Sequence, residues 1–548
     1  MSPRPRMRCD VAAGSVTAGK KAFERSRRAS SRRACLAYGT ATRRSFPMKE
    51  FGLFINGEWQ AAKGGKTAPT INPATEEPWA TVAVADREDS RKAVAAAKKA
   101  HDSGVWRNKS PQERGEILQK VAMAIFERQN ELAAAEVQDG GGTMRKAMSM
   151  DVPGTAQTFM HFGQYICGDE YKAMLQEEYD EIAPVPSKNY VVREPIGVCV
   201  GITPWNFPMI MASWKIAPAL AAGNCVVLKP ASVTPVTSLM VGEICTQAGV
   251  PAGVVNVISG PGGAAGEELA THPDVGKVAF TGSTEVGRRI MQLGAGTLKK
   301  VTLELGGKSP NIILKDANLD TAALGALFGT FMHQGQICES GTRVLVHESI
   351  HDQIVEKMLA GLKRIQMGDT MEMSTGMGPL VSSAQRDTVE KYVAIGKDQG
   401  AKCVAGGKRP ANLPKGYYYE PTIFDEVDNK QRIAQEEIFG PVVSVIRFRD
   451  EDEAVRIAND SVYGLGGAVW SADKDHAVAV ARRIETGTVW VNDYHMINIR
   501  FPFGGYKQSG VGRELGKWGL AEYHEVKHIH VGENTPPEGK FYLQLLLN

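Results

Sequence analysis

Cys338 lies in a sequence context that suits a reactive thiol better than a packed core. Small polar residues surround it in the segment His-Gln-Gly-Gln-Ile-Cys-Glu-Ser-Gly-Thr (333–342), and a predicted strand follows. A free cysteine is more often buried as a small hydrophobic residue. The loop context therefore makes Cys338 the candidate nucleophile, because an accessible thiol can attack an electrophilic carbon.

Glu304 is an acidic residue between apolar neighbours, in Leu-Glu-Leu-Gly-Gly-Lys (303–308). A carboxyl group in such surroundings is partly desolvated, which raises its pKa and suits a general base near neutral pH. The alternative is a glutamate at a strand end that forms a structural ion pair.

Asn206 follows a predicted strand in the segment Thr-Pro-Trp-Asn-Phe-Pro (203–208). The two prolines restrict the backbone, so the side-chain amide could be held as a hydrogen-bond donor to a developing oxyanion. Taken alone, the segment indicates only a stiff loop.

Two glycine-containing segments compete as the site for a pyrophosphate. Gly-Pro-Gly-Gly-Ala-Ala (260–265) follows a predicted strand and matches a loose dinucleotide-binding pattern, although a plain glycine turn explains it equally well. Gly-Ser-Thr-Glu-Val-Gly (282–287) follows another strand and begins a helix whose free N–H groups could bind phosphate. Spacing in the sequence does not choose between them.

His-Glu-Ser-Ile-His (347–351) has the spacing of a zinc-binding motif, which needs both histidines on one helix face. Residues 344–346 indicate a strand that runs into His347, and Ser349 with Asp352 resembles a helix N-cap. The two histidines would then lie on different elements, so we expect no metal site here.

The elements that must position these residues alternate between predicted strands and predicted helices. Short apolar runs rich in β-branched residues indicate strands at 197–202, 225–228, 254–258 and 277–280. Alanine- and leucine-rich stretches between them indicate helices. This alternation predicts an α/β protein with a doubly wound parallel sheet covered by helices on both faces. A second such series begins near residue 311 and runs to about residue 508.

The preceding part of the chain has simpler local signals. Residues 51–55, followed by Asn56 and Gly57, predict a β-hairpin. Residues 88–101 and 112–137 each have the pattern of one amphipathic helix.

Charge divides the chain at about residue 47. The 548 residues carry a net charge of +3, and 43% of them are hydrophobic. Residues 1–47 hold ten Arg and two Lys against one Asp and one Glu, so residues 48–548 carry −7. The composition excludes collagen-like and wholly disordered proteins, and the length suggests two or three domains.

The basic segment 1–47 lacks apolar periodicity, so we expect it to be disordered. It could be an organellar transit peptide, an extension upstream of a start at Met48, or a nucleic-acid-binding arm, which its single tyrosine disfavours. No apolar stretch is long enough to span a membrane, and the eight cysteines form no C-x-x-C pair. We therefore expect no nucleic acid or membrane as a partner, and a reducing compartment: the cytoplasm, or an organelle matrix if the segment is a transit peptide.

Seven sequence segments carry a resemblance to a known family. They are Pro-Trp-Asn-Phe-Pro (204–208), Leu-Lys-Pro-Ala (228–231), Phe-Thr-Gly-Ser-Thr-Glu-Val-Gly (280–287), Glu-Leu-Gly-Gly-Lys (304–308), Gly-Gln-Ile-Cys (335–338), Glu-Glu-Ile-Phe-Gly-Pro (436–441) and Pro-Phe-Gly-Gly-Tyr-Lys-Gln-Ser-Gly (502–510). In this order they resemble the NAD(P)-dependent, non-acylating aldehyde dehydrogenases, from about residue 56 to about residue 527.

The resemblance implies the oxidation of an aldehyde to a carboxylic acid through a covalent intermediate. Cys338 would add to the aldehyde as a thiohemiacetal, whose oxyanion would be held by Asn206 and the Cys338 backbone N–H. Hydride transfer to a nicotinamide would leave a thioester, which water activated by Glu304 would hydrolyse. Lys215 and Glu514 match positions suspected of proton relay.

The resemblance also implies a site for the cofactor, NAD or NADP. The residues expected there are Lys229 at the adenosine ribose, Trp205 and Ser283 at the pyrophosphate, and Glu437 and Phe439 at the nicotinamide ribose, with Ser232, Gly282 and Gly287 beside them. This favours the second glycine segment over the first.

Two residues depart from the commonest pattern of the family. Many NAD-specific members have a glutamate three residues after Lys229, where it repels a 2′-phosphate; here Ser232 could admit NADP. Glu339 directly follows the nucleophile, and its carboxylate would raise the thiol pKa if it faced inward. We expect Glu339 to point away from the thiol or to shape the substrate tunnel.

By analogy with the family, a mostly apolar tunnel leads to the nucleophile. Its expected lining is Met211, Trp214, Ile337, Glu339, Ile497 and Phe503. This lining favours aliphatic or aromatic aldehydes over small charged ones, although Arg500 keeps a semialdehyde open.

We expect three folded parts after the disordered basic extension. They are a Rossmann-like NAD(P)-binding domain (48–176 and 196–306), an α/β catalytic domain (307–508), and a small β oligomerisation arm with a C-terminal tail (177–195 and 509–548). By resemblance the arm joins copies of the chain, so a homodimer or homotetramer is expected.

Other functions are disfavoured by the same residues. In a CoA-acylating dehydrogenase, water activated by Glu304 would compete with the CoA thiol. A catalytically idle member would not need Cys338, Glu304 and Asn206 together. Without the family resemblance, a cysteine hydrolase with His333 as the partner of Cys338 would be the next interpretation.

Overall fold

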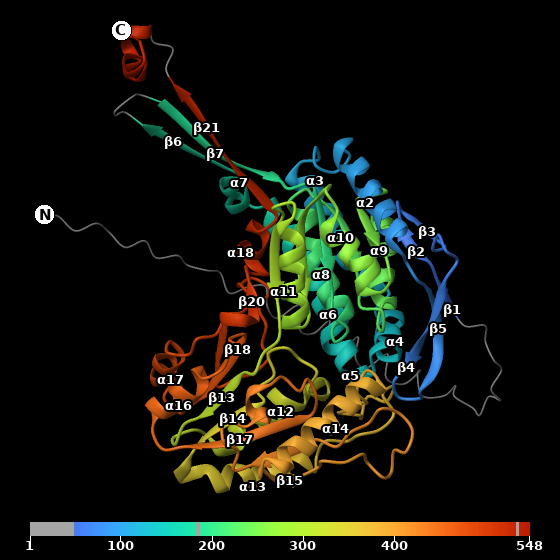
Figure 1. Ribbon diagram of the computed structural model, residues 1–548, viewed down its shortest axis with the longest axis vertical. Coiled ribbons are helices and arrows are strands. Elements are labelled where there is room, and N and C mark those ends of the chain that lie inside the picture. The colour runs from blue at the N-terminus through green and yellow to red at the C-terminus, as the bar shows by residue number, and fades with distance from the viewer. Residues whose placement is uncertain (1–48, 182–186, 533–535, 548) are drawn as a thin grey trace, which may run out of the picture. The chain divides into compact units, whose positions relative to one another are not determined.

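Two large, mainly parallel β-sheets organise the computed structural model (Figure 1). It describes residues 49–181, 187–532 and 536–547, so the extension 1–47 lies outside the described residues. Residues 49–548 form one compact unit, and the division of this unit into three parts stays a prediction. None of the described helices has the length and apolar character that crossing a membrane requires.

The first sheet has the strand order β20-β12-β11-β8-β9-β10-β2-β3. Its central, mutually parallel strands are β8 (Val198–Ile202), β9 (Cys225–Lys229), β10 (Val255–Val257), β11 (Val275–Thr281) and β12 (Lys300–Glu304). The chain runs outward from β8 through β9 to β10, then returns to place β11 on the other side of β8. The strand order therefore reverses between β8 and β11, and open α/β sheets bind ligands beyond the carboxyl ends of strands at such a point.

The edges of this sheet are antiparallel. They are β2 (Leu53–Ile55), β3 (Glu58–Gln60) and β20 (Gly510–Val511). Asn56 and Gly57 join β2 to β3 with φ values of 57° and 81°, which confirms the predicted hairpin and its two-residue turn. The strand β1 (Lys49–Phe51) instead joins β5 (Glu77–Ala83) and β4 (Thr67–Asn72) in a separate sheet.

Helices pack around the first sheet, and those between β8 and β12 alternate with its strands as predicted. The helices around this sheet are α2 (Arg87–Asp102), α3 (Pro111–Glu127), α4 (Gln129–Gly140), α5 (Met144–Lys146), the π-helix η1 (Ala147–Asp151), α6 (Val152–Cys167), α7 (Asp169–Leu175), α8 (Pro208–Ala221), α9 (Val236–Gln247), α10 (Glu267–Thr271), α11 (Thr284–Ala295) and α18 (Gly516–Ala521). The single helix predicted over 112–137 is wrong. Arg128 interrupts it with φ −96° and ψ 17°, and its guanidinium binds Glu131 and Glu243 instead.

The second sheet has the order β15-β16-β17-β14-β13-β18-β19 and is parallel except for β15. Its strands are β13 (Pro310–Ile313), β14 (Arg343–His347), β15 (Lys402–Ala405), β16 (Thr422–Asp425), β17 (Val442–Phe448), β18 (Gly466–Trp470) and β19 (Thr488–Val491). Its helices are α12 (Leu319–Phe331), α13 (His351–Leu362), α14 (Ser383–Asp398), α15 (Arg432–Gln435), α16 (Glu451–Asn459) and α17 (Lys474–Ala481). Successive residues of a strand face opposite sides, and Ile312 and Ile313 belong to two different apolar clusters. Both faces are therefore covered, which explains why these strands are continuously apolar.

A fourth sheet contains the segments expected to form the arm. Its strands are β6 (Gln176–Glu181), β7 (Ser187–Pro195) and β21 (His524–Gly532), in the order β21-β7-β6 (Figure 1). Part of the segment 509–548 lies elsewhere, because β20 pairs with β12 and α18 packs against α8. The expected arm boundary at residue 509 therefore falls too early.

Candidate active site

A cavity of about 420 Å³ lies at the point where the strand order reverses. It is lined by residues 204–207 after β8, 281–283 at the end of β11, 304–306 at the end of β12, and 337–339 before β14. Cys338, Glu304 and Asn206, which the sequence places in separate segments, therefore share one cavity.

The Cys338 thiol is half-buried, and its Sγ donates a hydrogen bond to Glu339 Oε2 at 3.0 Å. Burial raises the pKa of the thiol well above its usual value, and the Glu304 and Glu339 carboxylates add to this shift. The glycine pair after Glu304 allows the close approach of these segments, because a Cβ at Gly307 would overlap the carbonyl oxygen of Cys338.

Glu304 is the last residue of β12 and is 2% exposed. Neither of its carboxylate oxygens has a hydrogen-bond partner among the described residues. Burial raises its pKa well above the usual value, the negative charge of Glu514 adds to the shift, and Lys215 opposes it. The desolvated carboxyl group predicted from the sequence is confirmed.

Asn206 is buried, and its Nδ2 donates to the carbonyl oxygen of Gln336 at 2.8 Å. This bond ties the loop after β8 to the segment just before Cys338. An amide nitrogen carries two hydrogens, so the second hydrogen is left for another acceptor in the cavity.

Lys215 and Glu514 form a buried ion pair outside the cavity lining. Lys215 extends from α8 and also donates to Thr281 Oγ1 at 2.7 Å. Thr281 ends β11 and lines the cavity, while the charge of Glu514 acts on Glu304. The pair therefore contacts Thr281 at the end of β11 and acts electrostatically on Glu304 at the end of β12.

The expected adenosine-end residues follow β9. Burial lowers the pKa of Lys229 to about 8, and its Nζ donates to the Pro230 carbonyl at 2.9 Å. Ser232 Oγ donates to the Gly260 carbonyl at 2.9 Å, and a Cβ at Gly266 would lie 3.3 Å from Lys229 Cε. Ser232 therefore contacts the start of the first glycine segment, whereas Gly282 and Ser283 of the second segment line the cavity.

The residues on the nicotinamide side fit a dinucleotide. The helix α11 begins after Ser283, which lines the cavity, and its free N–H groups favour an anion there. A Cβ at Gly287 would lie 2.5 Å from Leu305 Cδ2, so only glycine lets α11 pack this closely. Beyond them, Glu437 lines the cavity and accepts from the Gly307 N–H at 2.9 Å. Burial raises its pKa to about 7.

Aromatic rings border the same side of the cavity. Trp205 and Phe439 meet edge to face with their ring centroids 5.1 Å apart. Phe439 has a φ of 55°, and Gln385 Nε2 donates to its carbonyl oxygen at 2.9 Å. Both rings belong to the cavity wall, which also includes Gly282.

All six residues expected in the tunnel line the cavity. Of the two expectations for Glu339, the one that it points away from the thiol is wrong, because it accepts the Cys338 hydrogen bond. A place in the tunnel wall agrees with its position in the cavity lining. Arg500 is exposed and does not line the cavity.

Sequence reasoning missed several lining residues. They are Met150, Gly154 and Gln157 from η1 and α6, Gln385 from α14, and His495 after β19. No local pattern marks them, because each reaches the cavity only through the packing of an element distant in sequence.

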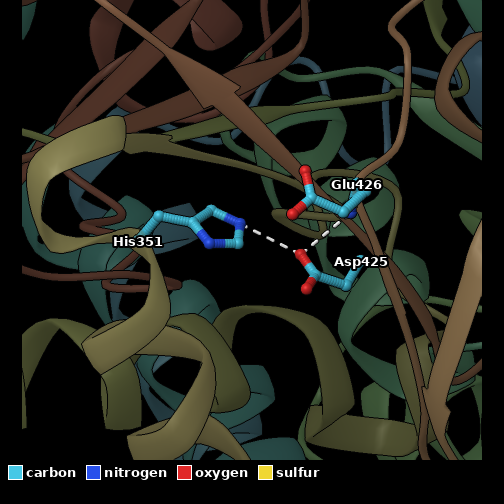
Figure 2. A group of neighbouring side chains, drawn as sticks. All are labelled: His351, Asp425 and Glu426. Atoms are coloured by element: carbon cyan, nitrogen blue, oxygen red, sulfur yellow. Dashed lines mark hydrogen bonds and ion pairs between the residues drawn. The ribbon is translucent and has the colours of Figure 1, made fainter.

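The histidines of the zinc-like motif lie on different elements, as predicted: His347 ends β14 and His351 begins α13. Among the described residues, one group has the spacing for a metal ion, namely His351, Asp425 and Glu426 (Figure 2). His351 Nε2 lies 3.0 Å from Asp425 Oδ1, and the Arg447 guanidinium contacts Glu426 at 2.7 Å. Side-chain cations already pair with these carboxylates, so we interpret the group as an ion-pair network.

Comparisons with known proteins agree with this geometry. The model of the aldehyde dehydrogenase family matches residues 59–529. Betaine aldehyde dehydrogenase of Bacillus subtilis (strain 168) is 47% identical over 490 residues, which cover 88% of this chain and 98% of that protein. An aldehyde dehydrogenase of Aspergillus niger is 44% identical over 481 residues, covering 87% and 94%. The crystal structure of betaine aldehyde dehydrogenase from Staphylococcus aureus with NAD⁺ has a TM-score of 0.85 at 41% identity, covering 88% of this chain and 95% of that one.

A Rossmann-like sheet with a thiol and a buried carboxyl at its switch point defines a nicotinamide-dependent oxidoreductase that works through a cysteine. The chain belongs to the aldehyde dehydrogenase family, and it oxidises aldehydes with NAD or NADP.

Proposed function

We propose that Cys338 is the nucleophile of this oxidation, Asn206 the oxyanion donor and Glu304 the base that activates water. The observation that carries the assignment is the buried, unpartnered carboxyl of Glu304 in the same cavity as the Cys338 thiol. A buried polar group without a partner costs free energy, so its retention indicates a group that acts on a substrate or on water.

The chain's own residues account for the two halves of the reaction. In the first, Sγ bonds to the carbonyl carbon, and the oxygen that gains the electron pair is held by Asn206 Nδ2 and the Cys338 N–H. A bound nicotinamide supplies the acceptor for the hydride. In the second, Glu304 takes a proton from water, the water oxygen adds to the thioester carbon, and the bond to Sγ breaks. Glu514 and Lys215 then pass the proton outward.

The substrate that we propose is an uncharged aliphatic or aromatic aldehyde. The cavity wall around Cys338 is an apolar cluster that includes Phe207, Met211, Trp214, Ile337 and Phe503. Its lining includes no Lys or Arg to pair with an anionic substrate. Of its three acids, Glu339 already pairs with His495, and burial raises the pKa of Glu304 and Glu437, which favours their uncharged forms. Transfer of a fixed charge into such a wall is costly unless a partner compensates it.

Two substrates of equal shape test this proposal. We expect 3,3-dimethylbutanal to have a kcat/KM at least about tenfold above that of its cationic isostere, trimethylammonio-acetaldehyde, because a preference of ~1.4 kcal/mol is tenfold. The measurement is NADH and NADPH formation without CoA, with the carboxylic acid quantified. A preference for the cation would place this chain with betaine aldehyde oxidation, and a requirement for CoA would contradict the role of Glu304.

We expect Ser232→Glu to weaken NADP binding about tenfold or more and to leave NAD binding nearly unchanged, because a carboxylate would repel the 2′-phosphate. Ser232 is exposed in the loop that follows β9, so the substitution needs no repacking. Dissociation constants for both cofactors provide the measurement. Ser232→Ala is the matched control, since it removes the hydroxyl without adding charge. An unchanged ratio of the two constants in Ser232→Glu would show that this position does not face the ribose.

We also propose that the enzyme is a homodimer or homotetramer joined through the β21-β7-β6 sheet. Its outer strands have no further strand beside them among the described residues. They expose apolar side chains, namely Tyr179, Val526, Ile529 and Val531. Such an edge is usually covered by another strand. The compartment that we propose is the cytoplasm or an organelle matrix, because the described cysteines are all free thiols.

A further inference from the structure

Glu339 connects the reacting sulfur to a buried histidine. Its Oε2 accepts the hydrogen bond from Cys338 Sγ at 3.0 Å, and its Oε1 lies 3.1 Å from Nδ1 of His495. Both Glu339 and His495 are buried, and both line the cavity. A thiol, a carboxyl and an imidazole therefore form one chain of contacts in the wall of the active site.

The contacts of His495 show where the protons lie. Its Nε2 is 3.1 Å from the carbonyl oxygen of Gly329, which can only accept, so Nε2 carries a hydrogen. The Nδ1 contact with Glu339 then holds one proton between imidazole and carboxyl. Burial acts to raise the pKa of Glu339, but the hydrogen bonds and charge of His495, together with the thiol, hold it below its usual value. Glu339 is therefore ionised near neutral pH.

The pKa of Glu304 is shifted in the opposite direction from that of Glu339. The Glu304 carboxyl lacks a hydrogen-bond partner, and burial with the charge of Glu514 raises its pKa well above the usual value. Of the two acids beside Cys338, Glu339 has a carboxylate oxygen 3.0 Å from Sγ, and its contact with His495 favours its ionised form.

We propose that Glu339 accepts the Cys338 proton as the thiol adds to the aldehyde, that His495 positions Glu339, and that Glu304 serves the water step alone. This inference rests on the proposed role of Cys338. In the addition, the Sγ–C bond forms, the carbonyl π pair moves to oxygen, and the thiol proton moves to Glu339 Oε2. When hydrolysis breaks the thioester C–S bond, the same proton returns to Sγ, so the chain is restored.

The first test separates the two halves of the reaction by rapid mixing. Nicotinamide reduction in the first turnover follows thiol addition, and the steady state includes hydrolysis. We expect Glu339→Gln, which keeps the shape but cannot take the proton, to slow the first turnover about 10²-fold or more. Glu304→Gln should keep its first turnover. A wild-type first turnover in Glu339→Gln, or its loss in Glu304→Gln, would overturn the division of labour.

The second test needs neither aldehyde nor cofactor. The rate of Cys338 alkylation by iodoacetamide is followed against pH by mass spectrometry of its peptide. With Glu339 as acceptor, the wild-type rate should fall with pH and then level off at acid pH, near the lowered pKa of Glu339, whereas in Glu339→Gln it should keep falling about tenfold per pH unit. At high pH the variant should react at least as fast as the wild type, because the loss of a negative charge lowers the thiol pKa.

The titratable groups that face Glu339 are Cys338, Glu304, His495 and Tyr494, whose hydroxyl donates to the Glu339 carbonyl at 2.9 Å. His495→Gln removes the group that holds the pKa of Glu339 down. The pH range in which the alkylation rate is level should therefore end at a higher pH than in the wild type. An unchanged limit would show that His495 does not position Glu339.

His351 and Asp425 supply the matched control, because they also form a buried imidazole–carboxylate pair but lie outside the cavity lining (Figure 2). Asp425→Asn should keep both the first turnover and the alkylation profile, and thermal unfolding is measured for every variant. Should Glu339→Gln fail to fold, the wild-type profile decides, since a wild-type rate that keeps falling about tenfold per pH unit at acid pH, with no level region, overturns the proposal. Failure of the wild type to oxidise any aldehyde would contradict the proposed function and leave the alkylation test valid.

Discussion

Replacement of Cys338 by alanine is expected to abolish aldehyde oxidation, with kcat reduced by about 10⁴-fold or more because no other group can form the covalent intermediate. The substitution removes one sulfur atom from a half-buried loop position, so folding and cofactor binding should persist. The measurements are aldehyde-dependent NADH and NADPH formation, cofactor dissociation constants and thermal unfolding.

Cys403→Ala is the matched control for this experiment. Cys403 is also a half-buried free cysteine, but it lies in β15 at the edge of the second sheet. Its replacement should leave turnover unchanged. Residual activity of Cys338→Ala near that of the wild type would remove Cys338 from the mechanism, even with the cavity and the cofactor site intact.

Glu304→Gln is expected to complete the first turnover and then stall, with the steady-state rate reduced about 10²- to 10⁴-fold. Glutamine keeps the volume of this buried side chain but cannot take a proton from water. The acyl group should remain on Sγ, so intact-mass spectrometry should find the enzyme heavier by the acyl group on the Cys338 peptide. Added hydroxylamine should release it as a hydroxamate.

The same prediction has a pH signature. Burial raises the pKa of Glu304, so its basic form appears only as the pH rises through that elevated pKa. Hydrolysis of the wild-type thioester should therefore be slow at about pH 5 and rise with pH, while in Glu304→Gln it should lack this rise.

Glu136 offers the control for a buried acid. Burial also raises the pKa of Glu136, in this case to about 8, but Glu136 does not line the active-site cavity. Glu136→Gln should not accumulate an acyl-enzyme. Accumulation of the acyl-enzyme in Glu136→Gln, or no accumulation in Glu304→Gln, would assign the activation of water to another group.

Much of the site could be predicted because its residues follow strands. Asn206 comes after β8, Ser283 after β11, and Glu304 ends β12. The carboxyl ends of parallel strands meet at one edge of a sheet, so prediction of a parallel sheet already brings these positions together. The apolar runs were also predictable, because strands covered on both faces are continuously apolar.

Helix limits and side-chain directions could not be predicted in the same way. The stretch 112–137 has one amphipathic pattern, yet it forms α3 and α4, because the Arg128 side chain binds Glu243 on the distant α9. The two glycine segments could not be ranked by spacing, yet Gly282 and Ser283 of the second line the cavity and no residue of 260–265 is in its lining. Both outcomes depend on partners that are remote in the sequence.

The sequence by itself determined the α/β class, the aldehyde dehydrogenase motifs and the positions of Cys338, Glu304 and Asn206, because these depend on the types and spacing of neighbouring residues. Only the tertiary structure decided which way Glu339 faces. Its direction depends on His495, 156 residues further along the chain, whose imidazole compensates the charge that burial would otherwise make costly. A charged side chain takes the direction in which it finds a partner, and the fold alone brings that partner within reach.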